Sequence, residues 1–416
     1  MVTGTHHPGP RPFSACLPPH VTCAASLPVK QRAFFAYCDT PPALPPTRAG
    51  ITTPGPSPEA SVKTTVARFS VAYHQLIDEH GQAVGRPPRI SPTTLRRLYG
   101  QMVRTRRFDE RAVRLQRTGQ LGTYASSLGH EALHVGLADA MRAEDVLLPT
   151  YREAGALLVR GVPMEQLLRY WGGDERGSDF AGPRRDFPYC VPIATQCTHA
   201  AGVASAMRLR REKRVAVCCL GDGASSKGDF YEALNLAGVW RLPLVFVVSN
   251  NQWAISVPLS KQTACATLAQ KSIAGGVPGV QVDGNDLLAV RQVMSRALSR
   301  ARRGEGPTLI EALTYRLGDH TTSDDARRYR PEAEVSAAWK RDPLPRLRQY
   351  MAGQGLWSTA DEEALLADCD AQVERAVAAY LATPLPTPTD MFDHLYAQLP
   401  PSLAGQRAEV AGAAHG

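Results

Sequence analysis

The chain has 416 residues, of which 44% are hydrophobic and 21% charged, the proportions of a globular protein with one large domain or two ordinary ones. Its formal net charge is +8, but the basic residues are scattered, so a nucleic-acid partner is not expected. No apolar run reaches the length of about 18 residues that a membrane span needs. Nine cysteines without a CxxC pair indicate neither a zinc cluster nor a disulfide framework, which favours a reducing compartment such as the cytoplasm.

The composition divides the chain into three parts. Residues 1–65 are rich in Pro, Ser, Thr and Ala without periodicity, and we expect a disordered N-terminal extension because so few apolar side chains cannot offset the entropy of ordering. Residues 66–400 predict one globular domain without an internal linker. Residues 401–416 are expected to form a flexible C-terminal tail.

The first part of the predicted domain has helical periodicity. Apolar Leu95, Leu98, Met102 and Val103 recur at helical spacing within residues 93–118, which predicts a long amphipathic helix. Further helices are expected from residue 128 onward, over 153–169 and over 193–212.

Strands and helices then alternate. The run at 215–222 is apolar almost throughout, as in a strand that is buried on both faces. Further strands are expected at 243–251, 279–284 and 307–317, and helices at 229–241 and 287–303. This alternation predicts an α/β fold, with a parallel sheet flanked by crossover helices.

Polar side chains end two neighbouring strands of this predicted sheet. Asp222 ends the strand at 215–222, and Asn251 ends the next one at 243–251. In a strand–helix–strand unit both ends lie at the sheet edge where open parallel sheets bind ligands, so the two side chains can point into one crevice. Carboxylate and amide oxygens are ligands that suit Mg²⁺, which also binds phosphate oxygens.

The loop after the first strand is suited to an anion. Gly221 and Gly223 allow the backbone to approach a bulky group closely, and the following helix can direct amide groups at it. A Mg²⁺-diphosphate cradle is therefore one interpretation of GDGASSKGDF. A tight turn with Asp222 as a cap is the alternative.

The segment 221–258 contains GDG and, about thirty residues later, NN. It resembles the thiamine diphosphate motif of the alpha subunits of 2-oxoacid dehydrogenases, and the similarity covers most of residues 90–400. The resemblance implies the thiamine diphosphate-binding fold, with Mg²⁺ held by Asp222, by Asn251 and by a main-chain carbonyl at Trp253. The family usually has Tyr or Phe at the last position.

The same resemblance implies further cofactor contacts. Gly223 and Ala224 match positions that touch the diphosphate. In PTYREAG, Tyr151 and Arg152 match a cofactor-binding pair, and an arginine can form two parallel hydrogen bonds to a phosphate. Without the resemblance, Arg152 is equally well explained as a surface residue at a helix start.

A third matching segment, CVPIATQ, resembles the loop that supports the thiazolium and diphosphate. Val191 and Ile193 occupy its contact positions, with plain core packing as the alternative. In some relatives the loop also holds potassium. Thr195 and Gln196 match that site, but Cys190 replaces a hydroxyl-bearing residue, so potassium is not expected.

GDHTTSDDARRYR, residues 318–330, resembles the active-site loop of the family. His320 matches the catalytic histidine, which assists acyl transfer to a lipoyl arm, and an imidazole titrates near neutral pH. A lone histidine is more often structural. Thr321 and Ser323 lie in a loop that is phosphorylated in mitochondrial relatives, a regulation that is not expected here. Asp324, Arg327, Arg328 and Tyr329 are expected to order the loop.

The implied activity is thiamine-diphosphate-dependent oxidative decarboxylation of a 2-oxo acid. The resemblance implies an α2β2 heterotetramer with a beta subunit that supplies the activating glutamate, and a lipoyl domain of the acyltransferase component as the second substrate. Residues 260–286 and 391–403 favour pyruvate, whereas HTTSDDA also resembles subunits for branched-chain 2-oxo acids such as 3-methyl-2-oxobutanoate.

Three other functions are less consistent with the sequence. A self-sufficient transketolase-like enzyme needs a second, pyrimidine-binding domain, for which the length leaves no room. A nucleotide-binding α/β protein needs GxGxxG or GxxxxGK[ST] after a strand, which the sequence lacks. A scaffold subunit without cofactor is favoured only if Asp222, Asn251 or His320 is lost, and all three are present.

Overall fold

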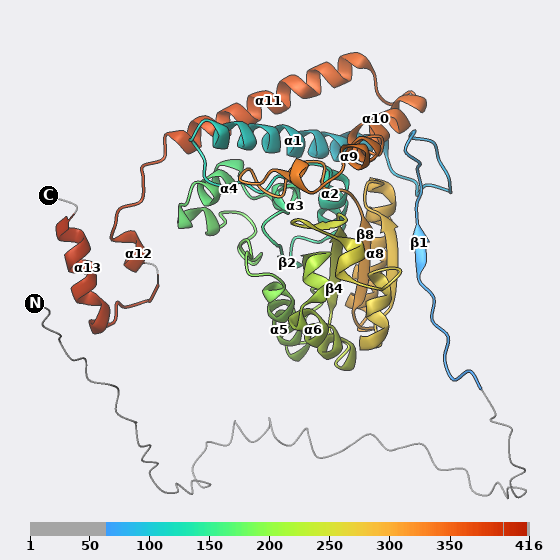
Figure 1. The fold of residues 1–416 in the computed structure, drawn as a ribbon, viewed down its shortest axis with the longest axis horizontal. Coiled ribbons are helices and arrows are strands. Elements are labelled where there is room, and N and C mark those ends of the chain that lie inside the picture. Colours follow the sequence, from blue (N-terminus) through green and yellow to red (C-terminus); the bar gives the residue numbers. More distant parts are fainter. Residues whose placement is uncertain (1–63, 394, 414–416) are drawn as a thin grey trace, which may run out of the picture. The chain divides into compact units, whose positions relative to one another are not determined.

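Six parallel strands in the order β1-β7-β8-β4-β3-β2 form the central sheet of the protein (Figure 1). The computed structural model describes residues 64–393 and 395–413, so nearly all of the predicted 1–65 extension lies outside the described residues. The strands of this sheet are β1 (Ala72–His74), β2 (Val146–Leu148), β3 (Ala216–Gly221), β4 (Leu244–Asn250), β7 (Gly279–Asp283) and β8 (Thr308–Leu313).

The predicted α/β class is confirmed, because every neighbouring pair in this sheet is parallel. β3 and β4 pair from Ala216 with Leu244 to Gly221 with Ser249, so both strands end at the same edge. The strand expected at 307–317 is shorter and ends at Leu313. The hydroxyl of the next residue, Thr314, lies 2.8 Å from the carbonyl oxygen of Gly129 and 2.7 Å from the amide oxygen of Asn285.

Alternate side chains of the buried strands enter two separate cores. On β3, Val217 and Cys219 pack with helices of one core, whereas Ala216, Cys218 and Leu220 pack with the other. The first core includes residues of α1 (Pro92–Arg117), α2 (Glu131–Ala140), α3 (Ala154–Arg160) and α8 (Leu287–Arg302), and the second includes residues of α5 (Thr195–Leu209) and α6 (Gly228–Val239). Burial on both faces explains why these strands lack a polar alternation.

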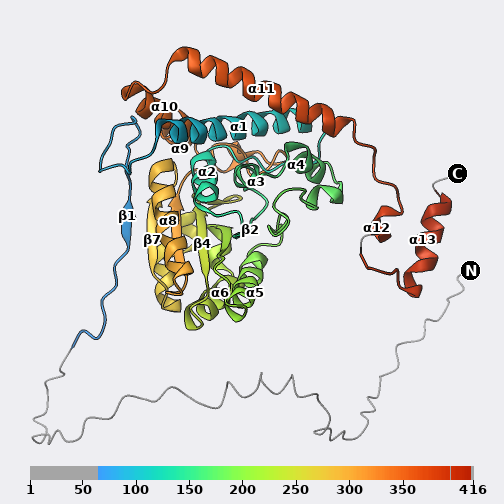
Figure 2. The same cartoon turned by 180° about the vertical axis from the view of Figure 1, so that it is seen from behind.

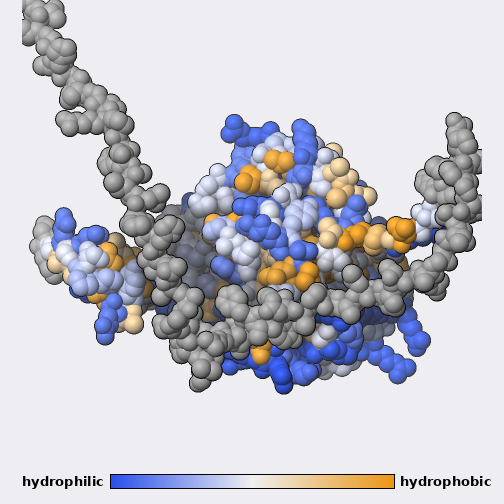
Figure 3. All heavy atoms as spheres, turned by 90° about the horizontal axis from the view of Figure 1, so that it is seen from below, coloured by the Kyte–Doolittle hydropathy of each residue, from blue (hydrophilic) through white to orange (hydrophobic). Residues whose placement is uncertain are grey.

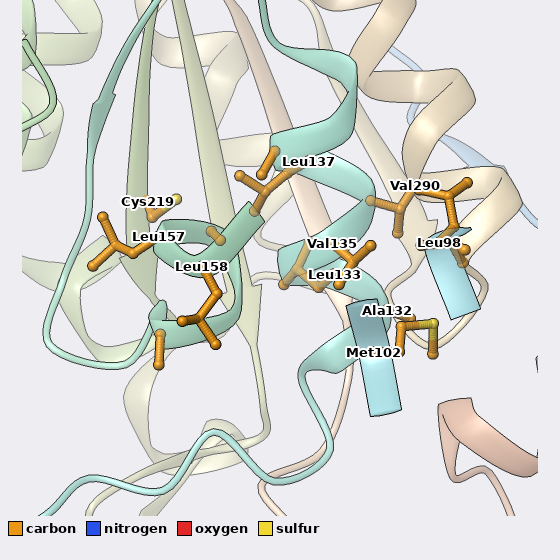
Figure 4. Packing of buried hydrophobic residues seen from close by; sticks show 14 of the residues in the cluster. Leu98, Met102, Ala132, Leu133, Val135, Leu137, Leu157, Leu158, Cys219 and Val290 are labelled. Atoms are coloured by element: carbon orange, nitrogen blue, oxygen red, sulfur yellow. The ribbon is translucent and has the colours of Figure 1, made fainter. Parts of the chain in front are cut away.

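Helix α2 (Glu131–Ala140) lies in the middle of the first core. Figure 4 shows its side chains between Leu157 and Leu158 of α3 and Val290 of α8. Gly136 permits the close packing, since a Cβ there would lie 2.8 Å from Cγ1 of Val290. The apolar positions of the sequence therefore hold α2 tightly against its neighbours.

The helix predicted over 153–169 is two helices, so that prediction was wrong. α3 (Ala154–Arg160) ends at Gly161, whose φ of 96° is the left-handed value that favours glycine at a helix end. Pro163 then precedes α4 (Met164–Trp171). A glycine and a proline this close together stop one helix and start the next.

The long predicted helix at 93–118 is confirmed as α1 (Pro92–Arg117), and its N-cap Ser91 accepts a hydrogen bond from the amide of Thr94. α11 (Thr359–Leu381) runs beside it (Figure 2). A buried ion cluster also anchors α1, because Arg106 pairs with Glu131 and, at 3.0 Å, with Asp342.

The flexible tail predicted at 401–416 contains a helix, α13 (Pro401–Ala413).

None of the described helices is long and apolar enough to cross a membrane. The remaining helices are α5 (Thr195–Leu209), α6 (Gly228–Val239), α7 (Leu259–Gln262), α8 (Leu287–Arg302), α9 (Glu332–Trp339), α10 (Pro343–Gly353), α12 (Asp390–Asp393) and α13 (Pro401–Ala413), with 3₁₀ turns at Glu175–Ser178, Gly223–Ser226, Ala269–Gly275 and Ala326–Arg328, and a small hairpin of β5 (Trp253–Ala254) and β6 (Val257–Pro258).

The molecular surface is mixed. Figure 3 shows apolar side chains interspersed among polar ones on the face seen from below. Large exposed apolar residues occur on α5 and α6 or directly after them, namely Leu209, Leu236, Val239 and Trp240. These two helices therefore bury one face in the second core and leave apolar side chains on the other.

Candidate active site

A cavity of about 340 Å³ lies at the edge where β3 and β4 end. Asp222 follows β3 directly and Asn251 follows β4 directly, and both side chains line the cavity. The structure therefore brings the two predicted metal ligands to one place, as the parallel sheet requires. Its lining residues are Thr150, Tyr151, Arg152, Glu153, Cys190, Ile193, Ala194, Gln196, Gly221, Asp222, Gly223, Ala224, Lys227, Ser249, Asn251, Trp253, Ala254, Ile255 and His320.

Asp222 is only 2% exposed, and burial raises the pKa of its carboxyl group. Its Oδ2 accepts a hydrogen bond of 2.7 Å from Nε2 of Gln262. Among the described residues, no basic side chain lies within salt-bridge distance of this carboxylate. A buried carboxylate without a cation is costly, so the position is suited to a bound metal ion.

The carboxamide of Asn251 is held at both ends. Its Oδ1 accepts a hydrogen bond of 3.2 Å from the main-chain amide of Trp253, and its Nδ2 lies 3.4 Å from Nε2 of His130. A carboxamide oxygen has two lone pairs, so Oδ1 can accept this bond and still bind a cation.

Trp253 contributes a main chain to the cavity and a side chain to a different cluster. Its indole Nε1 donates to Glu334 of α9 at 2.7 Å, and its ring lies 5.7 Å from that of Tyr329. The carbonyl oxygen predicted to bind Mg²⁺ accepts a hydrogen bond of 3.3 Å from Nη1 of Arg316. The larger ring is thus accommodated outside the metal position.

At the cavity, the glycine loop after β3 packs closely against Ala254. A Cβ at Gly223 would lie 2.7 Å from Cβ of Ala254, whereas a Cβ at Gly221 would meet nothing within 4 Å. Gly223 and Ala224 form the start of a 3₁₀ turn, which precedes α6 and its first residue, Gly228. Only the absence of a side chain at position 223 allows this approach of the two segments.

His320 lies between two guanidinium groups. Its Nδ1 is 3.2 Å from Nη2 of Arg152 and 3.2 Å from Nη1 of Arg316. Burial, with Arg152 and Arg316 next, lowers the pKa of His320 to about 3, so the imidazole is neutral at physiological pH. The other ring nitrogen of His320, Nε2, lies 3.4 Å from the hydroxyl of Tyr151.

The loop around His320 is ordered by its own side chains. Oδ2 of Asp324 accepts a hydrogen bond of 2.9 Å from the amide of His320, and the hydroxyl of Tyr329 also donates to it. Arg316 donates to the same hydroxyl at 3.0 Å. These contacts agree with the expected role of Asp324 and Tyr329, whereas the side chain of Arg327 bonds to its near neighbour Asp325, and the role of Arg328 stays a prediction.

Only some side chains of the segment before α5 line the cavity. Ile193 lines the cavity, whereas Val191 lies outside the lining and is 53% exposed. Gln196 donates from Nε2 to the carbonyl of Cys219 at 2.8 Å, and its buried Oε1 has no hydrogen-bond partner among the described residues. Contact of Val191 with a cofactor stays a prediction.

Four residues in the cavity lining or next to it were missed by reasoning from the sequence. Gln262 belongs to none of the site motifs, so nothing in the sequence indicated its bond to Asp222, whereas Ile255 stands within the matched segment 221–258. Lys227 stands within GDGASSKGDF, and Arg316 precedes His320 by four positions. Their proximity to the matched motifs was the available signal for these two basic residues.

The described residues fit a metal-bound diphosphate. They contain no group of three or more His, Cys, Asp or Glu that could hold a metal ion, so the cation would depend on the mixed set of carboxylate, carboxamide and main-chain oxygens. The glycine loop and the basic Arg152 and Lys227 suit an anion. The cavity volume is within the range of about 300–1,000 Å³ that small-molecule sites occupy.

Comparison with known proteins places this site in a family. The model of the dehydrogenase E1 component matches residues 99–389. The chain is 47% identical over 317 residues to the 3-methyl-2-oxobutanoate dehydrogenase subunit alpha of Mycobacterium tuberculosis, which covers 76% of this chain and 86% of the relative. It is 40% identical to the pyruvate dehydrogenase E1 component subunit alpha of Acholeplasma laidlawii, with coverage of 80% and 97%, and 40% identical to that of Staphylococcus aureus, with 82% and 93%. The chain therefore belongs to the dehydrogenase E1 component family, among the alpha subunits of thiamine-diphosphate-dependent 2-oxoacid dehydrogenases.

Proposed function

We propose that this subunit holds the diphosphate half of thiamine diphosphate and, with a beta subunit, decarboxylates a short 2-oxo acid and passes the acyl group to a lipoyl domain. The observation that carries the proposal is the convergence of Asp222, Asn251 and His320 on one cavity. These residues come from three separate loops of the chain, and the family match covers all of them.

The cation site is proposed from the oxygens at the strand ends. Asp222, Asn251 and the carbonyl of Trp253 would hold Mg²⁺, which neutralises the diphosphate. Gly223 and Ala224 offer main-chain amides, and Arg152 offers a guanidinium group, toward phosphate oxygens. When bound, thiamine diphosphate accepts the electrons left behind by CO₂ loss, so the protein mainly positions and polarises.

His320 has a defined tautomer in this arrangement. Guanidinium groups can only donate, so Nδ1 must accept from Arg152 and Arg316, and the proton therefore resides on Nε2. We propose that the Nε2–H group of His320 donates a hydrogen bond to the negative charge that develops when the acyl group is transferred. The neighbouring hydroxyl of Tyr151 keeps the imidazole turned in the required direction.

Assembly with a beta subunit is the second part of the proposal. The sequence matches one cofactor-binding module, and the resemblance assigns the activating glutamate to the partner. An α2β2 heterotetramer in the cytoplasm is the form that we propose. Apolar residues exposed on α6, namely Leu236 and Val239, support assembly because exposed apolar groups favour burial in an interface.

Two 2-oxo acids are candidate substrates. Pyruvate is the substrate that the segments 260–286 and 391–403 favour. The 47% identity to the mycobacterial subunit, against 40% to the pyruvate dehydrogenase subunits, favours 3-methyl-2-oxobutanoate as the second candidate. The chemistry at Asp222, Asn251 and His320 is the same for both.

Co-expression with the neighbouring beta subunit tests the proposal. The purified complex is assayed with pyruvate, 2-oxobutyrate and 3-methyl-2-oxobutanoate, with and without thiamine diphosphate and Mg²⁺. Activity that needs both additions is expected, and the highest kcat/KM identifies the substrate. A complex that assembles but neither binds the cofactor nor releases CO₂ would instead be a scaffold.

A further inference from the structure

His130 is a fully buried histidine next to the proposed metal site, and no motif in the sequence singled it out. It is 0% exposed and directly precedes α2. Its Nε2 lies 3.4 Å from Nδ2 of Asn251, and its Nδ1 lies 3.3 Å from the carbonyl oxygen of Ser127. Residues 121 positions apart in the chain thus meet at one ring nitrogen.

The direction of each hydrogen bond in this chain of contacts can be assigned. The main-chain amide of Trp253 can only donate, so the Asn251 atom that it contacts must be the carboxamide oxygen. The other end of the carboxamide is therefore the NH₂ group, which faces His130. Since NH₂ can only donate, Nε2 of His130 must accept.

The carbonyl of Ser127 makes this tautomer consistent. A carbonyl oxygen can only accept, so Nδ1 of His130 must carry the proton, which leaves Nε2 free to accept. In the series of hydrogen bonds that links Ser127, His130, Asn251 and Trp253, every donor then faces an acceptor. A reversed carboxamide would place NH₂ against the Trp253 amide.

We propose that His130 is a positioning residue, which holds the carboxamide of Asn251 so that Oδ1 faces the cation of the diphosphate site. This inference rests on the proposed function, since it concerns the metal ligand assigned there. A carboxamide nitrogen has no free lone pair for a metal, so turning the group by half a turn removes the ligand.

Among the described residues, the side chain of His130 forms hydrogen bonds only with Ser127 and Asn251. Its side chain makes no capping hydrogen bond at the start of α2, although it occupies the N-cap position. One turn further, His134 stacks on it with ring centroids 5.6 Å apart and is also fully buried. Neither ring nitrogen of His134 has a hydrogen-bond partner among the described residues, so it provides a matched control.

The test uses the complex of this chain with its beta subunit, stripped of metal by a chelator. Binding of thiamine diphosphate is measured by titration calorimetry at several Mg²⁺ concentrations. The variants are His130→Leu, which removes the acceptor, His130→Gln, whose Oε1 can accept from Asn251, and His134→Leu as the control. Thermal unfolding of each complex is recorded alongside.

The expected result is a loss of about 10- to 100-fold in apparent Mg²⁺ affinity for His130→Leu, as for other residues that orient metal ligands. His130→Gln should recover most of this affinity, and His134→Leu should match the wild type. Equal affinity of His130→Leu and wild type overturns the inference alone. Equal losses in His130→Leu, His130→Gln and His134→Leu also overturn it, because they indicate a packing role.

A wild-type complex that binds thiamine diphosphate independently of Mg²⁺ would overturn the metal site of the proposed function, and the role of His130 with it. The two failures are therefore distinguishable by the wild-type titration.

Discussion

Arg152 donates from Nη2 to the carbonyl oxygen of His320 at 3.0 Å, and the same nitrogen lies 3.2 Å from Nδ1 of His320. The bond joins the loop after β2 to the loop after β8, although 168 residues separate the two. Its Nη1 also contacts the carbonyl of Ser126. Arg152 thereby supports the proposed catalytic histidine while it remains at the edge of the cavity.

His320→Asn is expected to separate two half-reactions. The variant keeps a polar side chain but loses the Nε2–H donor, so acyl transfer to the lipoyl domain should fall about 100- to 1,000-fold, the usual cost of removing a hydrogen-bond donor to a developing charge. Decarboxylation measured with an artificial electron acceptor should fall much less. Steady-state assays with each acceptor check this. Equal losses in both assays would argue against a role in acyl transfer.

Asp222→Asn is expected to remove cofactor binding and leave the fold intact. The substitution retains the shape and can still accept from Gln262, but it removes the charge that is proposed to hold the cation. Affinity for thiamine diphosphate in Mg²⁺ should fall by more than the about 10- to 100-fold that loss of an outer partner costs. Calorimetry and thermal unfolding measure both effects.

Asp229→Asn is the control for Asp222→Asn, because Asp229 lies on α6 close in sequence but does not line the cavity. Its affinity should equal that of the wild type. Retained Mg²⁺-dependent binding in Asp222→Asn would contradict the assignment of the ligand.

Gly223→Ala is expected to lower stability and cofactor affinity together. The added Cβ would lie 2.7 Å from Cβ of Ala254, and overpacking of this kind costs about 1–3 kcal/mol. Gly221→Ala serves as the comparison, because a Cβ there meets nothing within 4 Å. Urea unfolding of both variants should give a lower free energy for Gly223→Ala alone. Equal stability of the two would show that the loop moves freely.

His134→Leu is expected to flatten the acid side of the stability profile. Burial, then Arg152, lowers the pKa of His134 to about 3 in the folded state, while the unfolded chain keeps the ordinary value of 6.5. Above pH 6.5 both states are neutral. As the pH falls from 6.5 toward 3, only the unfolded state takes up a proton, so the folded state loses stability.

Linkage gives about 2 kcal/mol for this loss at His134 between pH 7 and pH 5. The variant should lose that much less over the same interval, which urea unfolding at the two pH values measures. Parallel profiles for variant and wild type would mean that His134 protonates readily in the folded protein.

Arg106→Met is expected to destabilise the protein by about 3–5 kcal/mol, because it leaves Glu131 and Asp342 buried without their cation. Arg111→Met, which breaks a pair with the mostly exposed Glu374, should cost less than about 1 kcal/mol. Denaturant unfolding compares the two arginines on the same helix. Similar losses would indicate that the buried cluster adds nothing beyond side-chain packing.

The core of the fold and the proposed metal ligands could be read from local patterns. The apolar runs over β3 and β4 and the residues that follow them, Asp222 and Asn251, lie within one strand–helix–strand unit. In such a unit the strands are parallel and adjacent, so the sequence alone predicts that both ends share an edge. The residues at 161–163 also signalled the break between α3 and α4, although the periodicity obscured it.

What the sequence by itself determined is therefore the α/β class, the sheet edge that bears the candidate site, and the residue types proposed to bind a cation and a diphosphate. The tertiary structure alone decided that Gln262 bonds to Asp222, that Arg316 flanks His320 and that His130 contacts Asn251. These contacts join loops and helix ends whose side chains follow no period. Their meeting depends on how the whole chain closes around the sheet, and no short stretch of sequence encodes that.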